Sequence, residues 1–235
     1  MEFIPIKTRI LHPPKDNLIE VFDESLTEVH DDDIIIVTSK VVAIHQGRCV
    51  PMAGTDKEAL IAQEADRLYI REGRTRPLTI TQNALISASG IDESNGEGYY
   101  ILLPKDVFVF ARTIREHLQK RHCVKNIGVV ITDSHSLPFR YGALSIAIGC
   151  WGFVPIENHV GRTDIFGREL QYSKTNIPDA IAAAATLISG ECDEVTPIQI
   201  ARGIPNIVFS DDDPRPSFFV PYEDDLFKDL YRDFK

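Results

Sequence analysis

Two acidic segments of the chain have the composition of a site for a hard divalent cation. In the first, Asp92 is followed by Ser94 and Asn95, and in the second Asp133 is followed directly by Ser134. Mg²⁺ and Mn²⁺ are held in proteins by one or two carboxylates, hydroxyl oxygens, water and the phosphates of a bound nucleotide. The pattern therefore favours a metal site that needs few protein ligands. The alternative is that Asp92 caps a turn and Asp133 caps a helix.

Several arginines could bind a phosphate or a carboxylate. Arg140 and Arg202 each lie close to a glycine, and residues 161–168 place Asp164 and Arg168 next to further glycines. A guanidinium group forms paired hydrogen bonds with either anion, although an isolated arginine is more often part of a surface salt bridge. The chain has no Walker A motif, no GxGxxG fingerprint and no kinase signature. A nucleotide would therefore be bound without a P-loop.

The cysteines and histidines do not have the spacing of a zinc site. Cys49, Cys123, Cys150 and Cys192 form no CxxC pair, and the seven histidines form neither HxxxH nor HExxH. This usage indicates reduced thiols and argues against a zinc ribbon or a disulfide-stapled secreted scaffold. Any metal is expected to be held by oxygen.

The composition narrows the class of protein further. The 235 residues are 43% hydrophobic and carry 25 Lys and Arg against 35 Asp and Glu, a formal net charge of −10, which is typical of a globular protein without a general attraction for nucleic acid or anionic lipid. The first residues lack the apolar region of a signal peptide, and no run approaches the 18 apolar residues of a membrane span. We therefore expect a cytoplasmic protein that acts on small molecules.

The candidate residues lie at the ends of predicted strands. The β-branched apolar runs 34–37 and 127–132 predict buried strands, which end at Thr38-Ser39-Lys40 and at Asp133-Ser134. Further strands are predicted at 78–86, 99–103, 144–148 and 207–209, and helices at 55–73, 107–121, 177–188 and 223–234. The order predicts a mixed α/β (α+β) fold without the regular spacing of a Rossmann unit, formed by one domain over residues 1–235 with a C-terminal tail at 211–235.

An ordered set of motifs resembles the coenzyme F420-0:L-glutamate ligase (F420 gamma-glutamyl ligase) family. The motifs that carry this resemblance are Ser39-Lys40-Val41-Val42, Ser89-Gly90-Ile91-Asp92-x-Ser94-Asn95, Leu102-Leu103-Pro104, Ile131-Thr132-Asp133-Ser134, Ala147-Ile148-Gly149, Gly161-x-x-Asp164-x-x-Gly167-Arg168-x-Leu170 and Asp179-x-x-Ala182-x-Ala184-Ala185. Each motif is only moderately specific. Their shared order extends over nearly the whole chain from about residue 30, and this order carries the similarity.

The resemblance implies a GTP-dependent amide ligase with the α/β fold of that family, an intertwined homodimer and Mg²⁺ or Mn²⁺ at the nucleotide. It assigns metal binding to Asp92, Asp133 and Ser134, and nucleotide contacts to Ser39 and Asn95. The expected reaction joins L-glutamate to a carboxylate acceptor such as coenzyme F420-0 through an acyl phosphate. Arg140, Asp164 and Arg168 are candidate contacts for substrate or phosphate.

The chain also departs from the family motifs. Ile44 stands where the family has a lysine that reaches the nucleotide, and Arg9, Lys15 or Lys40 could replace that cation. Further departures are Gln82-Asn83, Asp106-Val107-Phe108, Ser136-Leu137-Pro138 and Asn158-His159-Val160-Gly161. Besides the ligase, three hypotheses stay open: a protein that binds nucleotide and metal without turnover, a ligase with a different acceptor, and a phosphate-releasing hydrolase.

Overall fold

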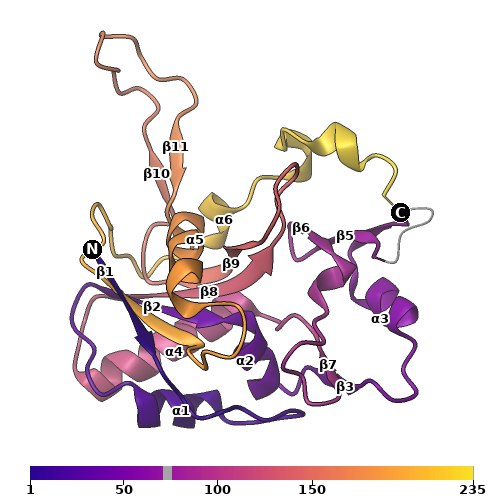
Figure 1. Ribbon diagram of the computed structural model, residues 1–235. Coiled ribbons are helices and arrows are strands. Elements are labelled where there is room, and N and C mark those ends of the chain that lie inside the picture. Colours follow the sequence, from indigo (N-terminus) through magenta and orange to yellow (C-terminus); the bar gives the residue numbers. More distant parts are fainter. Residues whose placement is uncertain (71–75, 235) are drawn as a thin grey trace.

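The computed structural model describes residues 1–70 and 76–234, and its centre is a five-stranded mixed sheet (Figure 1). The strand order is β1 (Glu2–Ile6), β12 (Ile198–Arg202), β2 (Asp33–Thr38), β8 (Ile127–His135) and β9 (Leu144–Trp151). Strands β2 and β8 are parallel, and every other neighbouring pair is antiparallel. The predicted mixed α/β class is confirmed.

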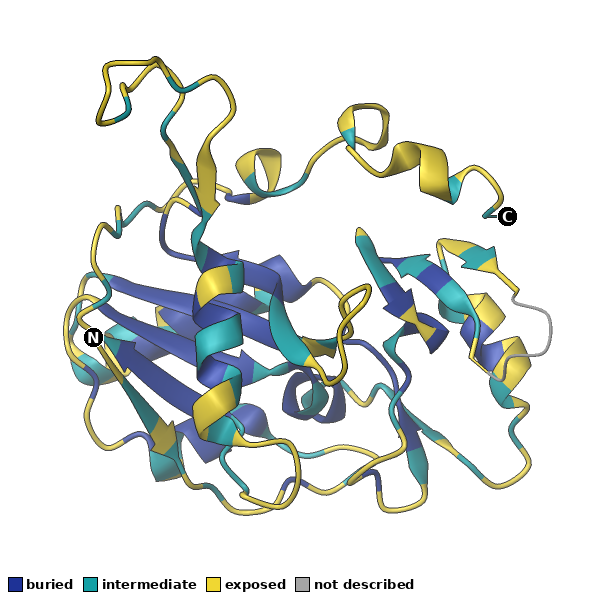
Figure 2. Cartoon of the chain, turned by 45° about the horizontal axis from the view of Figure 1, so that its top comes forward, coloured by how far each residue is buried: buried dark blue, intermediate teal, exposed yellow. Residues whose placement is uncertain are grey.

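The central strands are buried because helices cover both faces of the sheet. Helix α5 (Ile177–Ser189) packs on one face, and α4 (Val107–His122) packs on the other, with α1 (Leu18–Ser25) and α2 (Ser39–His45) on the same side as α4 (Figures 1 and 2). This double cover explains why β2 reads as a continuous apolar run and not as an alternating one. The contact with α4 is close, since a Cβ at Gly149 would lie 2.8 Å from Val107.

A smaller group of elements has its own apolar cluster beside the main sheet. It contains β3 (Cys49–Pro51) paired with β7 (Tyr99–Ile101), helix α3 (Lys57–Glu64), and the three-stranded sheet of β4 (Arg67–Tyr69), β5 (Leu78–Thr81) and β6 (Ala84–Ser87). Leu60 and Ile61 of α3 pack there with Ile91, Tyr100 and Leu102. The segment that ends at Asp92 is thereby fixed to this cluster.

Several predicted elements have different bounds in the structure. The helix predicted at 55–73 ends at Glu64, and β4 follows it, while residues 71–73 of that prediction lie outside the described residues. Its N-cap is Asp56, one residue after the predicted start at 55, and the Asp56 carboxylate accepts from the backbone N–H groups of Glu58 and Ala59. The strand predicted at 78–86 is a hairpin, because Gln82 and Asn83 both adopt positive φ.

The strand and helix predicted near the C-terminus are wrong. Residues 207–209 form only a single bridge between Phe209 and Phe153, whereas the sheet is completed by β1 and β12, which the sequence analysis missed. The segment 223–234 forms no continuous helix. It contains the 3₁₀ turns η2 (Tyr222–Asp224) and η3 (Lys228–Tyr231), after a short helix α6 (Arg215–Phe218) that packs near Phe108.

A hairpin arm extends away from the body of the molecule. Strands β10 (Ile156–Asn158) and β11 (Lys174–Asn176) pair at its base, and residues 159–173 form its tip (Figure 1). Three large apolar residues on this tip, Ile165, Phe166 and Tyr172, are 92%, 90% and 91% exposed. None of the helices in the described ranges has the length and apolar character needed to span a bilayer.

Candidate active site

A cavity of about 400 Å³ lies at the carboxyl ends of β2 and β8. These strands are parallel neighbours, so the polar residues that follow them come together at one edge of the sheet. The cavity is lined by five of the residues predicted from the sequence: Ser39, Asp92, Asn95, Asp133 and Ser134. The structure therefore brings together both acidic segments and the end of the first strand.

Ser39 and Asp133 are joined directly. In the register of β2 and β8, Thr38 lies opposite Thr132, so the residues that follow them, Ser39 and Asp133, stand beside each other. The Ser39 hydroxyl donates to Oδ1 of Asp133 over 2.5 Å. Burial of the carboxyl group raises the pKa of Asp133 to about 7, with the nearby charge of Asp92 adding to the rise and the bond from Ser39 opposing it. Asp133 lies inside β8, so the interpretation that it caps a helix is wrong.

Asp92 belongs to a polar cluster at the mouth of the cavity. Its Oδ1 accepts from the backbone N–H and the hydroxyl of Ser94, so the turn-capping interpretation of this residue is correct. Its Oδ2 lies 2.7 Å from the ammonium of Lys40, which also donates to the carbonyl of Ser94. Burial alone would raise the pKa of Asp92, but the hydrogen bonds and charge of Lys40 hold it below its ordinary value.

A loop that the sequence analysis did not assign closes the other side of the cavity. Residues 190–197 follow α5, and the chain turns there at Gly190, which has φ +71°. The side-chain amide of Asn95 donates to the carbonyl of Cys192 over 2.9 Å, and the Ser134 hydroxyl donates to Glu191 over 3.0 Å. The backbone of Asn95 turns there with a positive φ. The pair Gly190-Glu191 is one of the ordered motifs that resemble the family, but it carried no assigned role from the sequence.

The donor set at the cavity fits a hard divalent cation. Asp92 and Asp133 supply carboxylate oxygens and Ser134 supplies a hydroxyl, which are the ligand types that Mg²⁺ and Mn²⁺ prefer. Within residues 1–70 and 76–234, no three His, Cys, Asp or Glu side chains are grouped so that they could hold a metal alone. An ion here would complete its coordination with water or with ligand phosphates, as Mg²⁺ commonly does.

Three of the predicted residues do not line this cavity in the described chain. Arg140 lies in the exposed loop between β8 and β9, and Asp164 and Arg168 lie at the tip of the arm. The carboxylate of Asp164 accepts from the backbone N–H groups of Phe166 and Arg168, which stabilises the turn at the tip. Their part in substrate binding stays a prediction.

Among the residues that the structure describes, the cations lining the cavity are Arg9 and Lys40. Ile44 lines the cavity from α2 but is only 2% exposed, packed within the main apolar core. Arg9 is held at the rim by a bidentate ion pair with Asp16, at 2.7 and 2.8 Å. Lys40 forms an ion pair with Asp92. Of the three cations proposed to replace a lysine at position 44, Arg9 and Lys40 are therefore already paired with carboxylates, and Lys15 does not line the cavity.

The fold and the cavity define a mixed α/β protein whose acidic, oxygen-rich site lies at a sheet edge. A family model described as F420-0:Gamma-glutamyl ligase matches residues 5–203 of the chain. The chain belongs to this family.

Curated relatives agree over most of their length. A coenzyme F420:L-glutamate ligase from Methanopyrus kandleri is 32% identical over 223 residues, covering 87% of this chain and 86% of the relative. The proteins of the same name from Methanocaldococcus jannaschii and Methanococcus maripaludis are 32% and 30% identical, and cover 85% and 94% of this chain. These relatives are named as ligases that act with L-glutamate and coenzyme F420.

Proposed function

We propose that this chain is a ligase that uses GTP and a divalent metal to join L-glutamate to the carboxylate of coenzyme F420-0 or a similar acceptor. The observation that carries the proposal is the convergence of Ser39, Asp92 and Asp133 in one cavity, with Asn95 and Ser134 beside them. The family match and the names of the relatives supply the acceptor and the amino acid.

Each residue has a role in this proposal. Asp92, Asp133 and Ser134 would hold Mg²⁺ or Mn²⁺, which when bound neutralises charge on the triphosphate. Ser39 and Asn95 would contact the nucleotide. The raised pKa of Asp133 fits this use. Burial disfavours its negative charge, and a bound cation would stabilise that charge.

The proposed chemistry has two displacements. An oxygen of the acceptor carboxylate attacks the γ-phosphorus, the bond from that phosphorus to the bridging oxygen breaks, and GDP leaves with the electron pair. The product is an acyl phosphate. The amine nitrogen of glutamate then attacks the acyl carbon, the carbon–oxygen bond to phosphate breaks, and the nitrogen releases a proton as the amide forms. In both steps, the residues that line the cavity hold the reactants in place and balance their charge.

The experiment that tests this function follows phosphate release from GTP in Mn²⁺ and L-glutamate, with and without coenzyme F420-0. Release that depends on the acceptor, with a product heavier by one glutamate residue in mass spectrometry, supports the ligase. Release without the acceptor indicates a hydrolase. Nucleotide binding without release indicates a protein that has lost turnover, and either of these results contradicts the proposal.

Residues that differ from the family motifs bear on the choice of acceptor. Gln82, Asn83, Asp106, Val107 and Phe108 all line a second hollow of about 520 Å³, between the β5–β6 hairpin and the start of α4. Two of the four segments that depart from the family motifs therefore meet at this hollow, which favours a changed binding function there. A panel of acceptor carboxylates in the assay above would test the alternative of a ligase with a different acceptor.

We also propose that the protein is a homodimer that forms through the arm. The apolar side chains of Ile165, Phe166 and Tyr172 are exposed in a single chain, and a second copy would cover them. The arm would carry Asp164 and Arg168 toward the partner protomer. Light scattering on a size-exclusion column tests this: the double variant Ile165→Ser, Phe166→Ser should be monomeric, and an unchanged mass would contradict an arm-mediated dimer.

A further inference from the structure

One buried polar atom at the cavity has no hydrogen-bond partner among the described residues. Gln199 lies on β12 in the interior of the sheet, is 3% exposed and lines the same cavity as Ser39 and Asp133. Its side-chain oxygen Oε1 has no donor near it. A buried acceptor without a partner is costly, so such atoms in proteins usually bind water or ligand.

The orientation of this side chain is fixed by its surroundings. The Nε2 group of Gln199 donates to the carbonyl of Ala185 in α5 over 3.1 Å. A carbonyl oxygen accepts only, so the opposite rotamer of the amide would place two oxygens together. The amide nitrogen is therefore committed to the helix, and only the acceptor Oε1 is left for a ligand.

The separation between Gln199 and Ser39, which bonds to Asp133, matches the length of a nucleotide. Gln199 pairs with Ile36 of β2, and Ile36 precedes Ser39 by three residues. At about 3.3 Å per strand residue, the two positions are about 10 Å apart along the sheet. A base and the terminal phosphates of a nucleoside triphosphate are separated by a comparable distance. Ile36, the cross-strand partner of Gln199, also lines the cavity and provides apolar surface at this end, as a planar base requires.

We propose that Gln199 reads the base of the nucleotide and selects guanine. This inference rests on the proposed function, in which GTP binds with its phosphates at Asp92 and Asp133. The hydrogen-bonding edge of guanine has two adjacent donors, N1–H and the 2-amino group, which suit a lone acceptor. Adenine is read by an amide that offers both its oxygen and its nitrogen, and the nitrogen of Gln199 is already used by Ala185.

The test measures the dissociation constants of GTP, ITP and ATP in Mg²⁺ for the native protein, for Gln199→Leu and for Gln119→Leu. Gln119 is a matched control, because its side-chain amide also donates to a backbone carbonyl, that of Lys125. Gln119 is on α4 and does not line the cavity. We expect the native protein to prefer GTP over ATP by roughly tenfold or more, the scale of one unmatched buried hydrogen bond. Gln199→Leu should lose that preference, and Gln119→Leu should keep it.

A second measurement keeps the proposal testable if Gln199→Leu does not fold. For the native protein, the triphosphate of 1-methylguanosine, which lacks N1–H, or ITP, which lacks the 2-amino group, should bind roughly tenfold more weakly than GTP. Equal binding of GTP, ITP, ATP and the methylated nucleotide would mean that Oε1 meets only water, and would overturn this inference while leaving the ligase proposal in place. Absence of any nucleotide binding would instead contradict the ligase proposal.

Discussion

The hydroxyl of Ser39 donates a hydrogen bond of 2.5 Å to Oδ1 of Asp133, although 94 residues separate them in the chain. The bond exists because β2 and β8 are parallel neighbours in register at Thr38 and Thr132. It links the first residue of α2 to a carboxyl group whose pKa is raised by burial to about 7. The candidate site is thus an outcome of strand pairing.

Asp133→Asn should abolish tight Mn²⁺ binding and leave the fold intact. The variant removes a negative charge at nearly constant volume, and it resembles the protonated form that burial already favours in the absence of metal. Titration calorimetry with Mn²⁺ measures the affinity, and circular dichroism checks the fold. Asp92→Asn should weaken binding in the same way, whereas Asp32→Asn, in an exposed turn, should not change it. Unchanged affinity in Asp133→Asn would exclude this residue as a ligand.

Ile44→Lys should tighten GTP binding by about tenfold in the presence of Mn²⁺. An ammonium that reaches a phosphate contributes roughly 1.5–3 kcal/mol as a charged hydrogen bond, part of which is lost in placing lysine at a buried position. The control Ile10→Lys adds the same charge at the rim of the same cavity, where the side chain is 61% exposed. Equal effects of the two variants would show a general effect of charge, and no effect would mean that position 44 does not face the phosphates.

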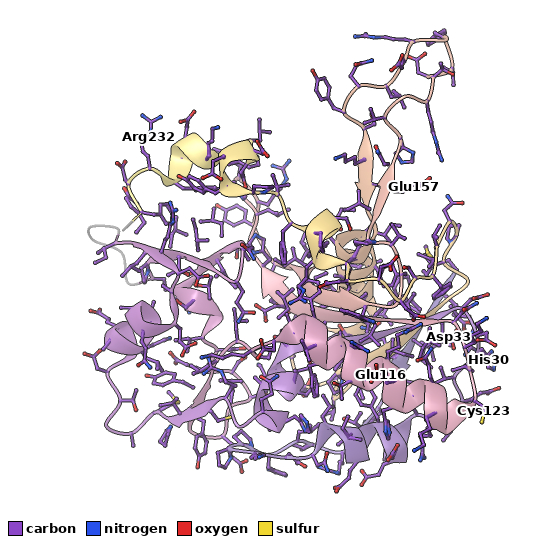
Figure 3. The ribbon with its side chains drawn as sticks, turned by 180° about the vertical axis from the view of Figure 1, so that it is seen from behind. His30, Asp33, Glu116, Cys123, Glu157 and Arg232 are labelled. Atoms are coloured by element: carbon purple, nitrogen blue, oxygen red, sulfur yellow. The ribbon has the colours of Figure 1, made fainter. Side chains whose placement is uncertain are left out.

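Asp33→Asn should destabilise the fold by about 3 kcal/mol. Asp33 is fully buried at the start of β2, where both its oxygens accept from Arg202 of β12 at 2.8 Å and Oδ2 also accepts from the backbone N–H of His30 (Figure 3). Loss of the carboxylate charge leaves this guanidinium without its counter-charge. Arg202, a candidate for anion binding from sequence, is therefore structural. Urea denaturation measures the change.

The surface pair of Arg112 and Glu116 on α4 provides the control for that measurement. Both side chains are 57% exposed, and their ion pair spans one turn of the helix (Figure 3). Glu116→Gln should change the free energy of unfolding by less than about 0.5 kcal/mol, because exposed pairs of this kind are weak. A similar loss in both variants would contradict the assignment of Asp33 as a buried structural charge.

Asp16 should make the stability of the protein depend on acid pH. The guanidinium of Arg9 and the N–H groups of His12 and Asn17 hold the pKa of Asp16 well below its ordinary value. A carboxyl group whose pKa is lower in the folded state adds stability above its unfolded pKa, and this stability is lost as the pH falls toward the folded pKa. Asp16→Asn should therefore cost about 1–2 kcal/mol at pH 7 and progressively less below pH of about 4.

Thermal unfolding of native protein and Asp16→Asn between pH 2.5 and 7 checks this dependence. Asp213→Asn is a suitable comparison, since Asp213 also pairs with an arginine, Arg215, but on the surface. Its effect should stay below about 1 kcal/mol at every pH. A loss in Asp16→Asn that is the same at pH 3 and pH 7 would show that the charge of Asp16 is not responsible.

The sequence by itself determined the features that depend on local patterns. The apolar runs of β2 and β8 predict strands because they are short and rich in β-branched residues, and the helical periodicity of α4 and α5 predicts helices. The ordered motifs also indicated the family. Short elements such as β1 escaped prediction, since its residues are held by pairing with β12, at the far end of the chain, and not by a pattern of their own.

Only the tertiary structure decided which polar residues meet. The parallel register of β2 and β8 placed Ser39 beside Asp133, and the loop after α5 brought Glu191 to Ser134. The same folding carried Arg168 to the tip of the arm, away from the cavity of its own chain. Sequence spacing does not determine these distances. They depend on the pairing of strands that are far apart in the chain, and on which buried side chains are left without a partner.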